Sequence, residues 1–404
     1  MTLELTQIVP QIEEAVINLR ASSHEYAGRK QLALSILRSQ DEHPDQLKAK
    51  LETARTTWLV AGLTGGLSRT YPLPPLPADW SATGIDGSNI DFDRHSALSC
   101  FLFNLGVARL RYGTSPEANL DSYARLYSSP DELVLKDPGG SNQEQRVPPA
   151  LLAVKRSVEE FAAAARAAGE TPPELPSVVL LDGTLIFWTL TDQAVQPFVT
   201  DLFLQKGILR HLDEFREACR GKQQVLASYV SYPGGTEVVN VLRVASCPFS
   251  PPDCTRYCEG PRAPKERPCA VVAGIQDREL LREVLNPGER SELFFSQSSV
   301  VNKHYGEHRV HFFYLNVGEE IGRVEIPKWI AADKALLDLT HTVVFDQCQR
   351  GMGYPVALQE AHEKAVVTVA DRRAFWNMIS QELEQNNLEK DTSQKAHSKR
   401  VRWL

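Results

Sequence analysis

Two short segments each carry an aspartate followed by a glycine and a hydroxyl residue: residues 84–88 read Gly-Ile-Asp-Gly-Ser, and residues 180–184 read Leu-Leu-Asp-Gly-Thr. The second segment continues the apolar run 177–181, which is too short for a helix and typical of a fully buried strand. An acid at the end of such a run lies where the strand leaves the core, and the glycine lets the backbone turn sharply. The sequence therefore predicts Asp86 and Asp182 at the ends of two strands, where they could hold a divalent cation if those strands are neighbours. A pair of simple Asp-Gly turns is the alternative.

The rest of the pattern predicts an α/β protein with a mixed sheet flanked by helices, because strand-like runs occur both consecutively and with helical interruptions. Helices are predicted over residues 148–168, 202–219, 277–285, 355–368 and 372–383, and strands over 97–111, 225–232, 237–244, 310–317 and 321–326.

The chain is expected to have three parts. Apolar residues recur at helical spacing between residues 3 and 63, and a proline-rich connector follows at 72–77, so residues 1–80 are predicted to form an N-terminal helical accessory region. Residues 81–385 form the main domain, with a cysteine- and proline-rich insertion at about 245–270. Residues 386–404 form a polar, basic tail.

The composition limits the partners of the chain. With 51 acidic and 44 basic side chains, the formal net charge is −7. A nucleic-acid partner would need a local basic surface, because the overall field repels phosphate. No stretch approaches the roughly 18 uninterrupted apolar residues of a membrane helix, and residues 1–5 lack the basic start and apolar core of a secretory signal. We therefore expect a cytoplasmic protein with no membrane partner.

The seven cysteines, an odd number, argue against a disulfide framework. The insertion contains Cys247, Cys254, Cys258 and Cys269, which is enough thiols for one tetrahedral structural zinc site. Only the pair separated by three residues has common zinc spacing. Scattered reduced thiols are therefore the alternative, and iron–sulfur ligation is a lesser one.

Two further regions offer groups for a catalytic site. The helix at 148–168 carries Glu159 and Glu160 just before the second Asp-Gly strand; by helical phase Glu159 lies nearer the apolar face and Glu160 points outward. Surface solvation is the alternative role for such acids. In the helix that begins at Pro355, His362 shares a face with apolar residues, so it is predicted to face inward with its ring toward Tyr354. His362 could bind metal or shuttle a proton, or it could be a satisfied core histidine.

Together these motifs resemble the NurA family of 5′→3′ DNA nucleases. The resemblance rests on Gly-Ile-Asp-Gly-Ser, the helix with an Arg/Glu pattern, Leu-Leu-Asp-Gly-Thr-Leu, and the late Gly-Tyr-Pro-x-x-Leu-x-x-Ala-His, and it covers about residues 80–385. The long form with its cysteine-rich insertion is similar to bacterial, cyanobacterial-like members. The family implies a ribonuclease H-like core and manganese- or magnesium-dependent cleavage of single- and double-stranded DNA. It also implies a ring-shaped homodimer that works with the hexameric HerA translocase in end resection.

The resemblance assigns roles residue by residue. Asp86 and Asp182 would bind the metal, and Glu160, directly before an aromatic residue, matches the helix acid, with Glu159 as fallback. His362 would complete the metal site or assist proton transfer, and Tyr354 would flank the scissile phosphate. One departure is a missing lysine: the strand at 228–232, Ser-Tyr-Val-Ser-Tyr, has none where family members carry one.

Two other functions remain open from the sequence. Asp-Gly-Ser/Thr turns also cradle nucleotide phosphates, as in an actin-like phosphotransferase, although no glycine-rich adenosine loop is evident between residues 300 and 350. A catalytically silent ring that only tethers the translocase is the second alternative. The basic residues of the tail could contact DNA or the translocase, or form a solvated terminus: Lys395, Lys399, Arg400 and Arg402.

Overall fold

The computed structural model describes residues 4–40, 44–93, 96–140, 143–147, 149–192, 194–260 and 263–388. The chain forms two compact units. Unit 1 comprises Met1–Pro72, Tyr232–Ser298 and Phe312–Arg323, and unit 2 comprises Leu73–Ser231, Ser299–His311 and Val324–Leu404. The predicted basic tail, Lys395 to Arg402, lies outside the described residues. Among the described helices, none is both long enough and apolar enough to span a lipid bilayer.

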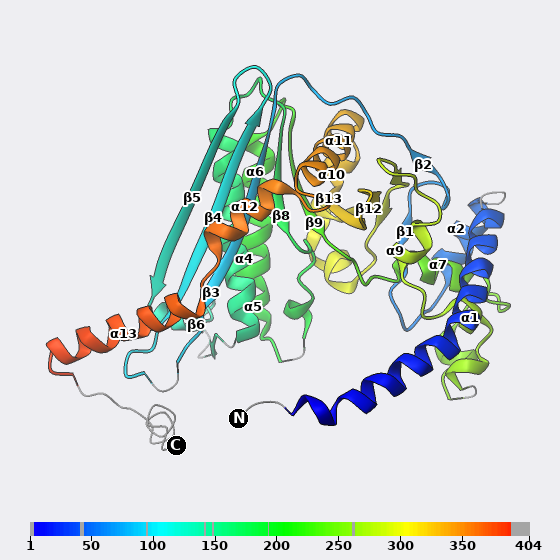
Figure 1. The fold of residues 1–404 in the computed structure, drawn as a ribbon, viewed down its shortest axis with the longest axis horizontal. Helices are drawn as coiled ribbons and strands as arrows, with labels where there is room; N and C mark the ends of the chain where they lie inside the picture. Colours follow the sequence, from blue (N-terminus) through cyan, green and yellow to red (C-terminus); the bar gives the residue numbers. More distant parts are fainter. Residues whose placement is uncertain are drawn as a thin grey trace. The chain divides into compact units, whose positions relative to one another are not determined.

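Unit 2 is built on a mixed sheet (Figure 1). Its strands are β3 (Trp80–Ile90), β4 (Phe101–Tyr112), β5 (Glu117–Tyr127), β8 (Ser177–Asp182) and β9 (Gln224–Val230), in the order β9-β8-β3-β4-β5. β4 runs antiparallel to both β3 and β5, whereas β8 runs parallel to both β3 and β9. An antiparallel three-stranded meander followed by two parallel strands, each reached through helices, is the ribonuclease H-like arrangement. The predicted fold class is confirmed.

Two helices of unit 2 position the candidate site. α4 (Pro149–Glu170) contacts β3 with an apolar face that includes Leu151, Val154 and Phe161. α12 (Val356–Ala365) crosses β3 and β4 (Figure 1). Side chains alternate between the two faces of a strand, and the contacts of β3 show that the two helices lie on opposite faces: Ser88 donates to the carbonyl of Ala365, whereas Asn89 accepts from Arg156 of α4.

Two glycines let α12 lie directly on the sheet. A Cβ atom at Gly84 would be 2.0 Å from the carbonyl oxygen of Ala357, and one at Gly106 would be 2.0 Å from that of Ala361. Any side chain at either position would lift the helix from the strands. The first glycine of the Gly-Ile-Asp-Gly-Ser motif thus sets the height of the helix that carries His362.

The other described elements of unit 2 surround this core. β5 and α11 were not predicted, because β5 is exposed on both faces and so has no apolar alternation, and α11 mixes apolar, polar and charged residues. The predicted helix at 202–219 begins as a π-helix.

The remaining described elements of unit 2 are α3 (Pro130–Leu133), β6 (Val134–Lys136), β7 (Glu144–Arg146), η2 (Trp188–Thr191), α5 (Pro197–Thr200), η3 (Asp201–Leu209), α6 (Arg210–Ala218), η6 (Val301–Tyr305), η7 (Gly306–His308), α10 (Lys328–Ala331), α11 (Lys334–Arg350) and α13 (Val369–Gln385).

Unit 1 combines the N-terminal helices with the cysteine-rich segment. Within the region predicted to be helical, residues 3–63, the described helices are Leu5–Gln7, Val9–Gln40 and Pro44–Thr53. Residues 54–63 are extended or irregular. β12 (Val310–Asn316) and β13 (Ile321–Pro327) each have residues in both units. The other elements of unit 1 are η1 (Leu5–Gln7), α1 (Val9–Gln40), α2 (Pro44–Thr53), β1 (Gly62–Leu63), β2 (Thr70–Tyr71), α7 (Glu237–Ala245), α8 (Cys254–Tyr257), η4 (Pro264–Glu266), η5 (Pro268–Val272), α9 (Asp277–Leu281), β10 (Arg290–Ser291) and β11 (Phe294–Phe295).

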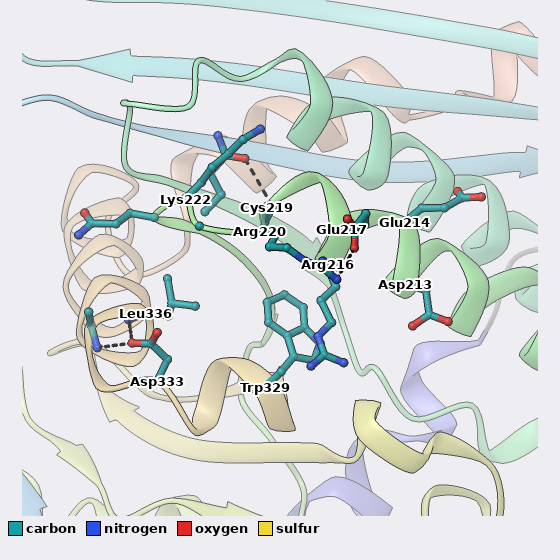
Figure 2. A pocket seen from close by; sticks show the side chains of 14 residues that line it. Asp213, Glu214, Arg216, Glu217, Cys219, Arg220, Lys222, Trp329, Asp333 and Leu336 are labelled. Carbon is teal, nitrogen blue, oxygen red and sulfur yellow. Dashed lines mark hydrogen bonds and ion pairs between the residues drawn. The ribbon is translucent and has the colours of Figure 1, made fainter.

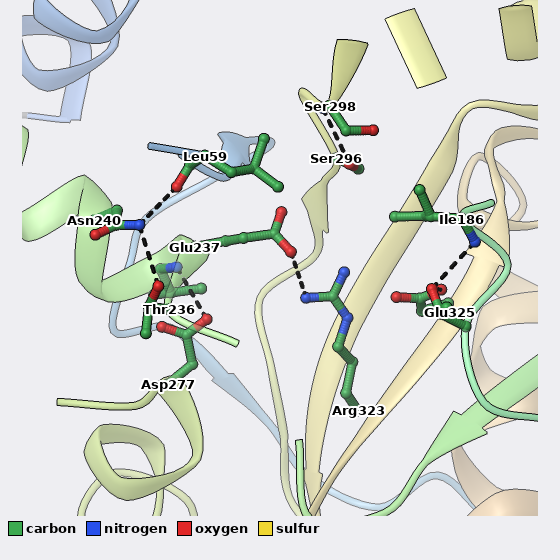
Figure 3. A network of polar contacts seen from close by, with 12 residues as sticks. Leu59, Ile186, Thr236, Glu237, Asn240, Asp277, Ser296, Ser298, Arg323 and Glu325 are labelled. Atoms are coloured by element: carbon green, nitrogen blue, oxygen red, sulfur yellow. Dashed lines mark hydrogen bonds and ion pairs between the residues drawn. The ribbon is translucent and has the colours of Figure 1, made fainter. Parts of the chain in front are cut away.

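The prediction of a strand at 237–244 is wrong, because these residues form α7. All residues from Glu237 to Leu242 are buried, so neither helical nor strand periodicity shows in the sequence. The helix start is fixed by a residue distant in sequence: the buried carboxylate of Asp277 accepts from the backbone N–H of Val238 at 3.1 Å and of Val239 at 2.8 Å (Figure 3). Asp277 also accepts from the hydroxyl of Tyr314 at 2.8 Å.

We expect Asp277→Asn to lower the free energy of unfolding by about 2–3 kcal/mol, because an amide cannot accept from three buried donors without presenting its own NH₂ group to one of them. Urea denaturation measures the change. Asp45→Asn, at an exposed acid in the first turn of α2, is the control and should change stability by less than about 0.5 kcal/mol. Equal effects of the two substitutions would contradict a capping role for Asp277.

Candidate functional site

The two aspartates lie level with each other on neighbouring strands. In the parallel pairing of β3 with β8, Ile85 is opposite Leu181, so the next residues in register are Asp86 and Asp182. Neighbouring strands lie about 4.8 Å apart, and residues at the same level point to the same face. Asp182 ends β8, as predicted. Asp86 does not end β3, because this strand stays paired with β4 as far as Ile90. Asp86 instead marks the point at which the pairing of β3 with β8 stops.

Each aspartate has one partner on the segment that leads into or forms α12. His362 Nδ1 lies 2.7 Å from Oδ2 of Asp86, and because a carboxylate accepts, the ring donates its Nδ1 hydrogen. The Tyr354 hydroxyl donates to Oδ1 of Asp182 at 2.9 Å. The structure therefore brings together Asp86, Asp182, Tyr354 and His362. All four were predicted site residues from segments far apart in sequence.

The prediction that His362 faces inward is wrong. Its side chain is 59% exposed, because the ring lies over the point where β3 and β8 separate and not in the core. The inward face of α12 is formed by the small residues Ala357, Ala361 and Ala365, which the two sheet glycines require. An exposed ring held through Nδ1 is available for proton transfer through Nε2.

Glu160 approaches β3 from the α4 face. A Cβ atom at Gly87 would be 2.6 Å from its Oε1, so the carboxylate occupies space that only glycine leaves open. The Glu160 side chain is 12% exposed and that of Glu159 is 29% exposed. The prediction that Glu159 lies nearer the apolar face and Glu160 points outward is therefore wrong. Arg156 Nε donates to Glu160 Oε1 at 3.0 Å. Burial raises the pKa of Glu160 to about 7, with the charge of Asp86 adding to the effect and Arg156 opposing it.

Glu159, the fallback acid, takes no part in this cluster. Its Oε1 accepts from the hydroxyl of the buried Tyr127 at 2.8 Å. Glu159 therefore serves the packing of α4 against the outer strands of the sheet.

The acids also influence one another on the α12 face. Although Asp182 lies at the surface, the groups packed around its carboxyl exclude water and raise its pKa. The charge of Asp86 raises it further, while the Tyr354 hydroxyl and His362 lower it. Burial, followed by the charge of Asp182, raises the pKa of Tyr354, so its hydroxyl remains protonated.

The donor set suits a hard divalent cation. Magnesium and manganese prefer carboxylate oxygens, which Asp86, Glu160 and Asp182 supply. A cation would offset the burial and the repulsion that together raise the pKa values of Glu160 and Asp182. As the side chains stand, no three His, Cys, Asp or Glu residues in the described part of the chain are arranged to hold an ion. Ion binding would therefore have to draw these carboxylates together.

A second group of residues, which the sequence did not reveal, holds the loop after Asp182. The buried carboxylate of Glu325 accepts from the Thr184 hydroxyl and from the Leu185 N–H, both at 2.8 Å (Figure 3 labels Glu325). The Tyr305 hydroxyl donates to the Leu185 carbonyl at 2.8 Å. The only sequence feature that pointed to this group is the Thr184 hydroxyl of the Asp-Gly-Thr motif, which anchors the turn. Its partner, Glu325, lies 141 positions away in the sequence, so the motif did not identify it.

The strand that lacks the expected lysine places an aromatic residue beside the site. Tyr229 of β9 is paired in register with Asp182, and its buried ring meets that of Tyr354 edge to face, with centroids 5.7 Å apart. This strand therefore contributes an aromatic contact, and not a charge, beside Asp182. The nearest cation that the contacts show is Arg156, on the α4 face.

We expect Tyr354→Phe to lower the rate of substrate turnover by roughly 10-fold to 100-fold and to shift the acidic limb of its pH profile to higher pH. The Tyr354 hydroxyl lowers the pKa of Asp182, so its removal raises that pKa and the carboxylate form appears only at higher pH. Rates measured between pH 5 and 9 test this, with Tyr232→Phe, at an exposed tyrosine of unit 1, as the control. An unshifted acidic limb in Tyr354→Phe would contradict the assignment.

A cavity of about 990 Å³ opens elsewhere in unit 2 (Figure 2). Its lining includes Arg216, Lys222, Trp329 and Gln224, the first residue of β9. Since Asp182 is level with Tyr229 near the other end of that strand, this cavity lies away from the carboxylates. The four predicted zinc-binding cysteines, Cys247, Cys254, Cys258 and Cys269, lie in unit 1 and not at this site.

Comparisons with known proteins match the same part of the chain. The NurA domain model matches residues 81–367, a range that contains Asp86, Glu160, Asp182, Tyr354 and His362. No curated protein matches the chain. One solved structure, the crystal structure of LC9-RNase H1, a type 1 RNase H with the type 2 active-site motif, is 12% identical and aligns over 42% of this chain and 71% of that chain, with a TM-score of 0.22.

Proposed function

Because the chain belongs to the NurA family, we propose that it is a divalent-cation-dependent DNA nuclease whose active site is formed by Asp86, Glu160, Asp182, Tyr354 and His362. The observation that carries this proposal is the register of β3 and β8, which places Asp86 and Asp182 level on neighbouring strands, each hydrogen-bonded to a residue of the Tyr354–His362 segment. The ribonuclease H-like strand order of unit 2 also supports cleavage of phosphodiester bonds.

The three carboxylates would hold the cation, manganese or magnesium. When bound, such an ion activates a water molecule and stabilises the leaving oxygen of a phosphodiester. Asp86 and Asp182 present their oxygens on the α12 face of the sheet, and Glu160 adds a third carboxylate past Gly87. Glu325 and Tyr305 keep Asp182 in place by fixing the turn that follows it.

His362 is suited to proton transfer more than to metal binding. With its Nδ1 hydrogen donated to Asp86, the neutral ring presents Nε2 as an acceptor. The exposed ring can take a proton from the attacking water and release it to solvent. Tyr354 orients Asp182 through its hydroxyl, and its proposed role is to flank the scissile phosphate.

Membership of the family also supports a more detailed set of proposals. These are 5′→3′ exonuclease and single-strand endonuclease activity, manganese as the activating ion, a homodimer that encloses DNA, and action in end resection with a hexameric HerA-type ATPase. The acidic net charge means that DNA binding requires a local basic surface, and the ring that family membership implies would provide one on its inner face.

End-labelled linear DNA tests the proposed activity. We expect the purified protein with manganese to shorten 5′-labelled duplex from its labelled end and to cut single strands, and we expect chelation of the cation to stop both reactions. Intact DNA together with ATP hydrolysis would favour the phosphotransferase alternative. Intact DNA together with binding of a HerA-type ATPase would favour the silent scaffold.

A further inference from the structure

The four cysteines of the insertion come together in unit 1. Cys247, Cys254, Cys258 and Cys269 all line one small cavity of about 20 Å³. Cys258 and Cys269 are buried. None of the four forms a disulfide.

Local backbone contacts place these thiols. Cys254 and Cys258 lie one turn apart at α8, whose start is capped by the Asp253 carboxylate accepting from the Arg256 N–H at 2.9 Å. The Cys254 N–H donates to the carbonyl of Arg55 at 2.9 Å, which ties the insertion to the segment after α2. Cys247 follows α7, and Cys269 lies in η5. The thiols therefore come from three separate elements, as in folded metal sites.

We propose that Cys247, Cys254, Cys258 and Cys269 bind one zinc ion as a structural site of unit 1. Zinc takes four thiolates in tetrahedral geometry, and closed sites of this kind stabilise the fold directly. The cavity is close to the roughly 10–15 Å³ that holds a single water. It is therefore sized for one ion and not for a cluster of several iron and sulfide ions.

Binding would change the thiols themselves. In the present structure the four cysteines are not close enough together to hold an ion, and the same is true of every other group of three His, Cys, Asp or Glu residues in the described ranges. Zinc would therefore have to draw the sulfurs inward. Each of the four thiols loses its proton to solvent as a zinc–sulfur bond forms, so the completed site carries a charge of −2.

Two cations beside the cavity offset that negative charge. Arg243 Nη2 lies 3.7 Å from the sulfur of Cys269. Lys50 Nζ donates to the carbonyls of Ala245 at 2.8 Å and Cys247 at 2.7 Å. A partly buried anion is costly unless it is paired, and a pair of cations matches the charge of a zinc tetrathiolate. Protonated thiols alone would have no such need.

Metal analysis of the purified full-length protein tests this proposal. We expect about one zinc per chain by mass spectrometry in the wild type and in Cys219→Ser, which alters a buried cysteine of unit 2. Cys258→Ser should lower the zinc content at least about tenfold. Since that variant could misfold, the wild type supplies a second readout: chelator treatment should lower its melting temperature, and zinc should restore it.

Three results would overturn the proposal. They are wild-type protein without zinc, wild-type protein containing iron and sulfide in place of zinc, or Cys258→Ser that retains the zinc of the wild type. All of these measurements are made without DNA, so they are independent of the proposed nuclease activity.

Discussion

Replacement of Asp86 by asparagine is expected to lower cation-dependent DNA cleavage by about 10³-fold, the range typical of losing a charged group that acts in the transition state. Asparagine keeps nearly the same shape, but it has one side-chain oxygen, so it can accept from the N–H of Gly87 or from Nδ1 of His362 and not from both. It lacks the negative charge that the bound cation requires. The loss should therefore appear in kcat, with the KM for DNA changed by less than about threefold.

Asp121→Asn is the matched control for this substitution. Asp121 lies on β5 and accepts from Arg109 at 3.0 Å, in the same sheet but away from the carboxylate cluster. In urea denaturation, the free energy of unfolding of both variants should lie within about 1 kcal/mol of the wild-type value. If Asp86→Asn cleaves DNA within a few-fold of the control, the assignment of the site is wrong even if the protein is a nuclease.

Replacement of Glu160 by glutamine is expected to stabilise the cation-free protein above pH 7. Burial raises the pKa of Glu160 from 4.5 to about 7, so between these values the folded protein keeps a proton that the unfolded chain has released. The free energy of unfolding therefore falls as the pH rises through this window, by about 3 kcal/mol in total. Glutamine is neutral at every pH and does not have this cost, yet it should abolish cleavage.

Urea denaturation with a chelator present, at pH 5 and at pH 8, measures this effect. Glu159→Gln changes the neighbouring residue of the same helix and should show no gain specific to pH 8. Adding manganese should stabilise the wild type more than Glu160→Gln, because the ion compensates the charge of the buried carboxylate. A Glu160→Gln variant that is less stable than the wild type at pH 8 would show that the ionised carboxylate is already well compensated by Arg156.

The sequence predicted much of the site because its signals are local. Each Asp-Gly pair marks the place where a strand separates from a neighbour, and the register that pairs Ser81 with Ser177 and Ile85 with Leu181 puts the two acids level. The spacing between Tyr354 and His362 likewise puts one residue just before α12 and the other in its last turn, where each contacts one of the two aspartates. Short-range pattern and backbone geometry were sufficient here.

The remaining features depend on contacts between distant residues. Helical phase placed Glu160 outward, but Gly87, a residue of another element, leaves the space that buries it. The same reasoning placed His362 inward, whereas the α12 backbone meets the sheet at Gly84 and Gly106 and His362 lies on the exposed side of the helix. The sequence predicts a strand where α7 lies, because the residue that caps this helix, Asp277, comes from another segment. Glu325 had no local signal at all.

The most direct test of the central claim counts manganese ions bound per chain by electron paramagnetic resonance and measures the rate of DNA cleavage in the same samples. If Asp86, Glu160 and Asp182 hold the cation that cleaves DNA, the rate should rise in proportion to bound manganese, and Asp86→Asn should lose both together while Asp121→Asn keeps both. Cleavage that proceeds without bound manganese, or manganese bound equally well by Asp86→Asn, would contradict the claim.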